Sequence, residues 1–436
     1  MSVISSVRGR QVLDSRGRPT VEVELVLKDG VVARASVPSG ASTGTHEAHE
    51  LRDGDGAFFN GLGVLSAVAH VNGEIAGALR GHDVMDQRGC DSLLRELDGT
   101  PGLSRLGANA VLGTSLAICR ASANVSRQPL YRRIAELAGV AEPVLPMPMV
   151  NILSGGLHAG RGMDVQDFLA VPIAATSMLE AIRLVAQVRD AATVVCAERG
   201  LPTLLADEGG VSPGCRTGRA ALELLMASIE RAELVPGVDV AIAIDVAATS
   251  LYDGTTGDYH LRREGRRVSA AEMIDIISSW VDDFPIVSIE DALDEEDWDG
   301  WHTLTARLGD RVRLIGDDLF TTNPYRLSQG IAKGCATGVL VKVNQNGTLT
   351  GALEVVSAAE AADYVSVVSA RSGETEDDFL ADLAVGTAAG QIKVGSVRSS
   401  ERLAKYNQLI RIAEDSGLGF SPLPLPGSFS AAELTP

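Results

Sequence analysis

Charged side chains recur directly after short apolar runs in the second half of the chain. Asp245, Glu290 and Asp317 each come at the end of such a run. Carboxylate oxygens are the hard ligands that Mg²⁺ prefers, with water and substrate completing its octahedron. A single acid in this place could merely cap the helix that follows. The repetition in successive units instead favours a site for a divalent cation.

Other apolar runs in the same region are followed by basic residues and by a further acidic residue. Lys342 and Lys393 are the lysines of this set, and a lysine beside a divalent cation and a second lysine is driven toward its neutral, basic form. Glu208 supplies a second acid–base group, while Arg371 with Ser372 offers a planar fork and a hydroxyl for an anion such as phosphate. Base, acid, metal and anion clamp together predict removal of a proton beside a carboxylate, followed by loss of a β-substituent.

The apolar runs themselves predict the elements that position these residues. Each run has the length of a buried strand and precedes a helix-like stretch, the pattern of parallel strands with crossover helices. In a (β/α) barrel the carboxyl ends of the strands open on one face, so the charged side chains would meet there. We therefore expect an α/β fold with a barrel. The runs interpreted as strands are 202–206, 240–244, 286–289, 312–316, 338–341, 364–368 and 390–392.

The first part of the chain predicts a separate, smaller α+β domain. Alternating apolar residues at 20–25 and 31–37, with a turn at 29–30, indicate an antiparallel sheet, and residues 58–138 have helical periodicity, strongest at 109–122. The prolines between 143 and 148 interrupt any helix, so we place the boundary near residue 140. The expected domains are 1–140 and 141–420, and the proline-rich tail 421–436 is expected to be flexible.

A segment of small residues in the first domain could also reach the site. Residues 39–44 read Ser-Gly-Ala-Ser-Thr-Gly and are long enough to fold over the mouth of a barrel. Their hydroxyl and carbonyl oxygens could coordinate a second Mg²⁺. Taken alone, such a segment is more often a plain turn.

The charge and composition of the chain exclude several classes of function. The 436 residues contain 57 acidic residues and 38 Lys and Arg residues, a net charge of −19, which opposes binding to nucleic acid or to an anionic membrane surface. No apolar run reaches the roughly 20 residues that cross a bilayer, and the first residues lack the order of a signal peptide, so we expect a cytoplasmic protein. Five scattered cysteines without a C-x-x-C pair are interpreted as reduced thiols.

Motifs along nearly the whole chain resemble those of enolases (phosphopyruvate hydratases). They stand in the family's order: DSRGRPTVEVE (14–24), VPSGASTG, ADEGG, SIEDAL, GDDLFTTNP, VKVNQNGTLT, RSGETED and GQIKVGS (390–396). The resemblance implies a small α+β N-terminal lid domain on a modified (β/α)8 barrel, one or two Mg²⁺ per subunit, and a small phosphorylated carboxylate as substrate. It also implies a homodimer or larger homo-oligomer, because Arg16, Glu22 and Glu414 match positions of enolase dimer contacts.

The resemblance further implies a role for each candidate site residue. Lys342 corresponds to the base that removes the α-proton, and Glu208 to the acid that helps the β-hydroxyl leave. The other implied roles are Asp245, Glu290 and Asp317 as ligands of the first Mg²⁺, Ser42 as the loop ligand of the second, Lys393 as a contact to the substrate carboxylate, His158 as a further substrate contact, and Arg371 with Ser372 as the phosphate clamp.

The chain departs from the enolase pattern around the expected pocket. Where enolases have Asn, Glu and His, it has Ser154, Asp167 and Ala370, and we count Asp167 and Ala370 among the substrate-binding residues. Lesser departures are at 160–162 and at Asn346. Because each of the first three replacements is smaller, we expect a pocket enlarged beside the phosphoryl group, as for the larger substrate of the enolase-like carboxyphosphonoenolpyruvate synthases of phosphonate pathways. Two alternatives stay open: an ordinary glycolytic enolase whose pocket has drifted, and an inactive enolase-like binding protein.

Overall fold

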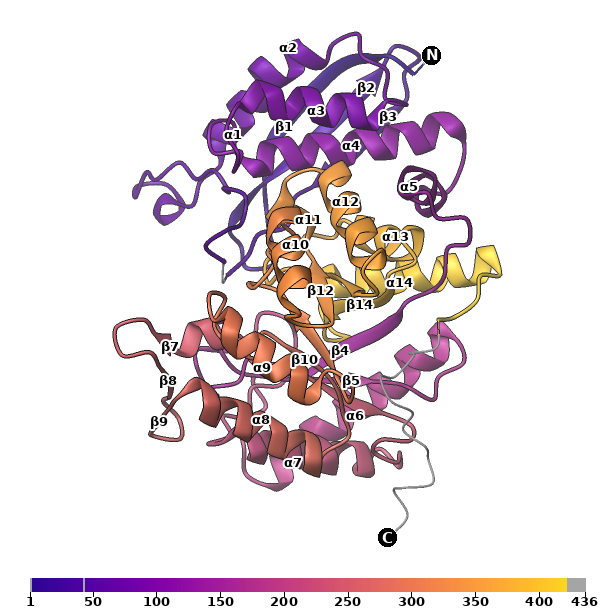
Figure 1. Ribbon diagram of the computed structural model, residues 1–436. Helices are drawn as coiled ribbons and strands as arrows, with labels where there is room; N and C mark the ends of the chain where they lie inside the picture. Colours follow the sequence, from indigo (N-terminus) through magenta and orange to yellow (C-terminus); the bar gives the residue numbers. More distant parts are fainter. Residues whose placement is uncertain (1, 42–43, 422–436) are drawn as a thin grey trace.

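The computed structural model describes residues 2–41 and 44–421, which form a small N-terminal region packed on a barrel (Figure 1). Ser42 and residues 422–436 of the predicted tail lie outside the described residues. The last helix of the N-terminal region, α5 (Leu130–Ala138), ends shortly before the first barrel strand, β4 (Met147–Ser154). The domain boundary near residue 140 stays a prediction.

The N-terminal region is a three-stranded antiparallel sheet covered by helices. Strands β1 (Ile4–Leu13), β2 (Pro19–Leu27) and β3 (Val32–Ser36) pair in sequence order, as the alternation of apolar residues predicted. Val21, Val23 and Leu25 of β2 are buried in the core, where the strand packs against helix α4 (Ala108–Ser126), itself buried along most of its length. The other helices of this region are α1 (Leu65–His70), α2 (Ala76–Leu79) and α3 (Gln87–Asp98).

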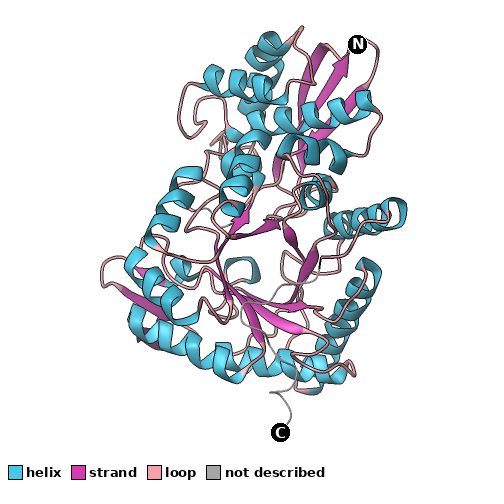
Figure 2. Ribbon diagram, turned by 45° about the vertical axis from the view of Figure 1, so that its right-hand side comes forward, coloured by secondary structure: helices cyan, strands magenta, loops and turns pink. Residues whose placement is uncertain are grey.

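The second part of the chain contains a closed barrel of eight strands with helices on its outside (Figure 2). This confirms the predicted α/β barrel, and its interior is filled by apolar side chains such as Met147, Leu169, Leu340 and Val367. Around the ring the strands are β4, β5 (Asp167–Val171), β6 (Ala241–Asp245), β10 (Ile286–Glu290), β11 (Arg313–Gly316), β12 (Gly338–Val341), β13 (Val365–Ser369) and β14 (Gly390–Gly395).

The structure corrects the predicted strands at one end of this series. The run 202–206 is not a strand: only Leu205 forms an isolated bridge, to Val211, and Leu204 is 74% exposed, so the run is not buried as a barrel strand must be. Its expected place is taken by β4 and β5, which precede it in the sequence. Strand β5 runs antiparallel to both of its neighbours, so the ring is not wholly parallel as expected.

Helices and one small sheet complete the outside of the barrel. Among the described residues, no helix is both long and apolar enough to span a membrane. The larger outer helices are α6 (Met178–Glu198), α7 (Gly218–Arg231), α8 (Ala270–Asp283), α9 (Trp298–Leu308), α10 (Pro324–Lys333), α12 (Leu349–Glu360), α13 (Phe379–Gly386) and α14 (Ser400–Ser416). A sheet of β7 (Tyr252–Asp253), β8 (Asp258–Leu261) and β9 (Arg266–Val268) follows β6.

The N-terminal region meets the barrel where the loop after β13 leaves the ring. The backbone groups of Ser39 and Gly373 exchange two hydrogen bonds, of 2.8 and 2.9 Å. The guanidinium of Arg16 donates to the carbonyl of Ser39 and to the carboxylate of Asp14, and it fills the space that a side chain at position 373 would need. Ser39 is therefore held beside the loop that follows β13.

Candidate active site

The predicted site residues converge at the carboxyl end of the barrel. Strand pairing sets Glu290 beside Asp245 and Lys393 beside Ser369, so residues far apart in the sequence lie on one rim. A narrow, mainly polar cavity lies there. The predicted residues that line it are His158, Glu208, Asp245, Lys342, Ala370, Arg371, Ser372 and Lys393.

Asp167 reaches this rim although it is the first residue of its strand. Because β5 is antiparallel to its neighbours, its amino end lies with the carboxyl ends of the others, and Asp167 pairs with Ser154 and Asp245 in the barrel register. Its side chain is buried behind the cavity wall rather than on it. Ser154 is likewise buried and bonds the same carboxylate, at 3.2 Å.

Lys393 holds two of the predicted metal ligands together. Its ammonium lies 2.7 Å from a carboxylate oxygen of Asp245 and 2.7 Å from one of Glu290. Burial opposes the charge of Lys393, but these two carboxylates outweigh burial and raise its pKa well above the usual value. Burial and the charge of Asp245 also raise the pKa of Glu290 well above its usual value. Two carboxyl groups thus share one ammonium at this point of the rim.

Lys342 contacts the third predicted ligand. Its ammonium donates to Asp317, whose other carboxylate oxygen accepts a hydrogen bond of 2.9 Å from Gln345. Burial opposes the charge of Lys342, but the charge of Asp317 outweighs it and raises the lysine pKa. In this arrangement Lys342 is therefore protonated, and it must lose that proton before it can act as a base.

The carboxylates around Glu290 fit a divalent cation. Oε1 of Glu290 is buried and has no hydrogen-bond partner among the described residues, so an acceptor oxygen remains for a metal. A tighter group of carboxylates is formed by Asp291, Asp317 and Asp318. Both oxygens of Asp291, however, accept hydrogen bonds of 2.8 Å from the backbone amides of Asp317 and Asp318, so Asp291 serves the backbone. We therefore keep Asp245, Glu290 and Asp317 as the set that fits Mg²⁺.

His158 contacts two carboxylates, one on the cavity wall and one behind it. His158 lies 3.1 Å from Asp167 through Nε2 and 3.8 Å from Glu208 through Nδ1. Burial opposes the charge of the imidazole, but the charge of Asp167 outweighs it and raises the pKa of His158 to about 9. Burial also opposes the charge of Glu208, yet His158 and other cations lower its pKa. The proton between these two groups therefore resides on His158.

Arg371 and Ser372 lie on the cavity beside Ala370. Burial opposes the charge of Arg371, but a carboxylate from the N-terminal region, Glu47, outweighs it and raises the guanidinium pKa. The hydroxyl of Ser372 accepts a hydrogen bond of 3.2 Å from Arg16. Arg16 is therefore turned inward, and its side chain is only 5% exposed, which leaves little of this guanidinium for the implied dimer contact.

Sequence reasoning missed several residues that hold the site. Gln166 donates to Asp245 at 3.2 Å, and Asn151 donates to Asp167 at 2.6 Å. Gln345 and Glu47 connect Asp317 to Arg371 through hydrogen bonds. Gln166 stands next to Asp167 in the sequence and could have been found there. Glu47 follows no strand, and nothing in its local sequence marks it.

The two parts of the chain match the two domain models of one family. Residues 4–134 match the model described as "Enolase, N-terminal domain", and residues 142–420 match "Enolase, C-terminal TIM barrel domain". The chain belongs to the enolase family. Membership accounts for the closed barrel.

We expect His158 of this enolase-family protein to stay protonated at neutral pH, with a pKa of about 9 against the ordinary 6.5. Because the folded-state pKa is raised, the pairing stabilises the protein fully below about pH 6.5 and is lost as the pH rises through about 9. Asp167→Asn removes the nearest negative charge, so the imidazole should then titrate at lower pH. NMR of the ¹³C-labelled ring, assigned with His158→Gln, measures both values.

Asp164→Asn is the matched control for this prediction. Asp164 lies in the same loop but accepts hydrogen bonds from the backbone amide of Arg263, not from His158. Its replacement should leave the titration of His158 in place. A His158 pKa that is the same in the parent protein and in Asp167→Asn would contradict the assignment.

Proposed function

We propose that the protein is a Mg²⁺-dependent enolase-family lyase that removes the proton α to a carboxylate and eliminates a β-hydroxyl from a 2-phosphoglycerate-like substrate. The observation that carries the proposal is the cavity that Lys342 and Glu208 line together with Lys393, Arg371 and Ser372. The cavity therefore has cationic side chains for both anionic ends of such a substrate, and it also has an acid–base pair in Lys342 and Glu208. An inactive binding protein has no need of that pair.

In the proposed reaction Lys342 takes the α-proton, and the electron pair of the C–H bond moves toward the carboxylate as an enediolate. The pair then forms the C=C bond as the β-C–O bond breaks, and the departing hydroxide receives a proton from Glu208 to leave as water. The low pKa of Glu208 leaves this carboxyl ionised in the structure. A bound anionic substrate raises the pKa of Glu208 and of His158 beside it, which favours protonation of the acid.

Asp245, Glu290 and Asp317 would hold Mg²⁺ in this proposal. The ion, when bound, supplies positive charge that stabilises the dianionic intermediate and lowers the pKa of neighbouring Lys342. Lys393 adds a fixed cation on the carboxylate side, and Arg371 with Ser372 holds the phosphoryl group. The implied loop ligand of a second ion, Ser42, remains part of the proposal.

The wall beside the anion clamp favours a substrate whose phosphoryl-bearing end is larger than that of 2-phosphoglycerate. Ala370 lies on the cavity wall between the backbone of Lys393, to which its amide donates at 2.8 Å, and the clamp residue Arg371. Ser154 and Asp167 do not line the cavity; they pack behind His158. Only the replacement at 370 therefore enlarges the phosphoryl side directly, and we propose a phosphono- or carboxyphosphono-type substrate on that basis.

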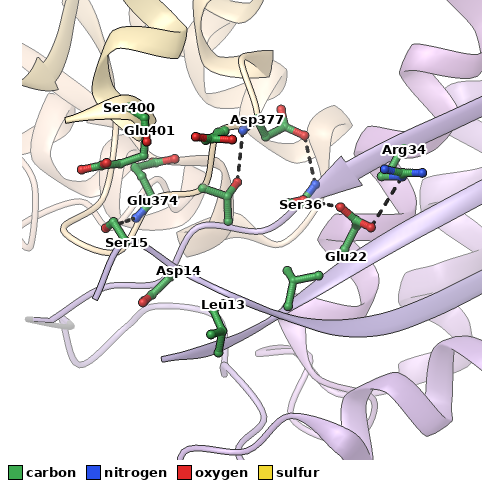
Figure 3. Close-up of a pocket in the computed structure, with 13 residues that line it drawn as sticks. Leu13, Asp14, Ser15, Glu22, Arg34, Ser36, Glu374, Asp377, Ser400 and Glu401 are labelled. Atoms are coloured by element: carbon green, nitrogen blue, oxygen red, sulfur yellow. Dashed lines mark hydrogen bonds and ion pairs between the residues drawn. The ribbon is translucent and has the colours of Figure 1, made fainter. Parts of the chain in front are cut away.

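We also propose a homodimer. A cleft of about 480 Å³ opens between the β1–β3 sheet and the segments 374–377 and 400–401 (Figure 3). Glu22, which the family resemblance places at a dimer contact, lines this cleft and bonds Ser36 and Arg10. Leu13 in the same cleft is 55% exposed, and its burial by a second copy would remove apolar surface from water.

The base assignment predicts that Lys342→Ala loses about 10²- to 10⁴-fold or more in rate, because the group that takes the α-proton is then missing. Exchange of the α-proton of 2-phosphoglycerate with D₂O in the presence of Mg²⁺ measures the step itself. Lys333→Ala, an exposed lysine at the end of α10, is the control and should exchange as the parent does. Exchange that persists in Lys342→Ala would place the base elsewhere.

The metal assignment predicts that Asp317→Asn and Asp245→Asn each weaken Mg²⁺ binding, because each removes a negative charge from an all-oxygen site. Asp318→Asn is the discriminating control: Asp318 belongs to the tighter carboxylate group but not to the proposed set, so this variant should bind Mg²⁺ as the parent does. Titration calorimetry measures all three. Weakening by Asp318→Asn alone would move the site to Asp291 and Asp318.

The pocket assignment predicts that restoring Ala370→His, Ser154→Asn and Asp167→Glu together improves kcat/KM on 2-phosphoglycerate. Only position 370 lies on the cavity wall, and one neutral hydrogen bond regained there contributes about 0.5 to 1.5 kcal/mol, so the gain should be roughly 2- to 10-fold. Ala370→His alone should recover the phosphoryl-side part. A parent that already turns over 2-phosphoglycerate as well as the triple variant is an ordinary glycolytic enolase, and the substrate proposal is then wrong.

A further inference from the structure

One carboxylate from the N-terminal region reaches the anion clamp of the barrel. Glu47 pairs with Arg371 through both of its oxygens: Nη1 donates to Oε2 at 2.9 Å and Nη2 donates to Oε1 at 3.2 Å. The side chains of Glu47 and Arg371 are 7% and 3% exposed. A two-point contact between planar groups fixes the plane of the guanidinium as well as its position.

The same carboxylate is tied to the metal side of the site. Oε1 of Glu47 also accepts a hydrogen bond of 3.2 Å from Nε2 of Gln345, which in turn donates to Asp317 at 2.9 Å. Gln345 is itself held by the hydroxyl of Thr322, which donates to its Oε1 at 2.8 Å. Glu47 and Gln345 therefore join the anion clamp to a proposed metal ligand, and neither of them lines the cavity.

Glu47 is also fixed from its own side. The backbone amide of Gly44 donates to Oε1 at 3.0 Å, and the amide of Ala48 donates to the carbonyl of Gln345 at 2.8 Å. A carboxylate in this position does not line the cavity and cannot contact substrate as the walls stand. Its contacts instead set the geometry of groups that do.

We propose that Glu47 is a positioning residue of the elimination reaction: it fixes the guanidinium plane of Arg371 and, through Gln345, its separation from Asp317. Glu47 then sets the distance between the phosphoryl end and the metal-bound end of the substrate, although it contacts neither end. The inference rests on the proposed function. Misplacement of a reacting group by about 1 Å can cost about 10²-fold in rate, so a residue that only positions Arg371 can still have a large effect on turnover.

The test compares Glu47→Gln with the parent by kinetics. The variant keeps the size of the side chain and leaves the charge of Arg371 to attract the anion, so KM should change far less than kcat. Nη1 of Arg371 also donates to Asn344 at 3.1 Å, so the guanidinium stays in place but loses the two-point contact that sets its plane, and the turnover number should fall about 10- to 100-fold. Glu47→Asp restores the charge with a shorter reach and should recover part of the loss. An unchanged kcat, or a loss confined to KM, overturns the proposal.

A second measurement does not depend on turnover. In protein labelled with ¹⁵N-arginine, the two-point pair restricts rotation of the Arg371 guanidinium, so its Nη protons should give separate, slowly exchanging signals, assigned with Arg371→Lys. Glu47→Gln should merge or broaden them. Signals that survive in Glu47→Gln overturn the positioning role. If the parent turns over no substrate, the proposed function fails, and this measurement alone still decides the role of Glu47.

Glu50→Gln is the matched control for both measurements. Glu50 lies on the same segment, is part-buried and pairs with an arginine, Arg52, at 2.7 Å, whereas the arginine paired with Glu47 is Arg371. Its replacement should leave kcat and the Arg371 signals as in the parent. Equal effects of Glu50→Gln and Glu47→Gln would show a general loosening of the segment and overturn the proposal.

Discussion

The burial of many charges at one end of the barrel is the constraint on which the rest of the structure depends. Three carboxylates and two lysines are almost removed from water there, and each is paired: Lys393 with Asp245 and Glu290, and Lys342 with Asp317. An isolated buried charge is far too costly to keep, so the barrel must hold every partner within contact distance. Within the described residues Oε1 of Glu290 has no hydrogen-bond partner, so an acceptor oxygen remains there for a cation.

Strand register supplies the accuracy that such pairing needs. Neighbouring strands place their last residues side by side, as Asp245 and Glu290 are placed, and apolar side chains below them fill the interior of the ring. The reversed direction of β5 brings Asp167 to the same rim from the start of its strand. Close backbone approach matters as well: Gly395 has φ of 107°, and a Cβ there would lie 3.0 Å from the carbonyl oxygen of Glu208. A larger residue would push the acid away from the cavity.

Local sequence was enough to predict those strands that are buried along their whole length. The runs that end at Asp245, Glu290, Asp317 and Lys342 form strands that are buried at every position. The run 202–206 has a similar composition but is exposed, and composition alone does not distinguish the two. Strand β4 begins among prolines that we interpreted only as a domain boundary. Contacts such as Glu47 with Arg371 join positions 324 residues apart and depend on how two regions of the chain pack, which no local pattern encodes.

The distribution of paired charges also explains where a member of this family can change. Removing one partner of a buried pair leaves the other uncompensated and costs about 3 to 5 kcal/mol, so Lys342, Lys393 and the carboxylates they contact are tightly constrained. Ala370 carries no charge and lies on the wall beside Arg371. A small residue at this position therefore leaves no buried charge without its partner. Ser154 and Asp167 keep their mutual hydrogen bond and the contact to His158. Divergence in substrate is therefore expected at neutral wall positions, while the groups that move the proton stay as they are.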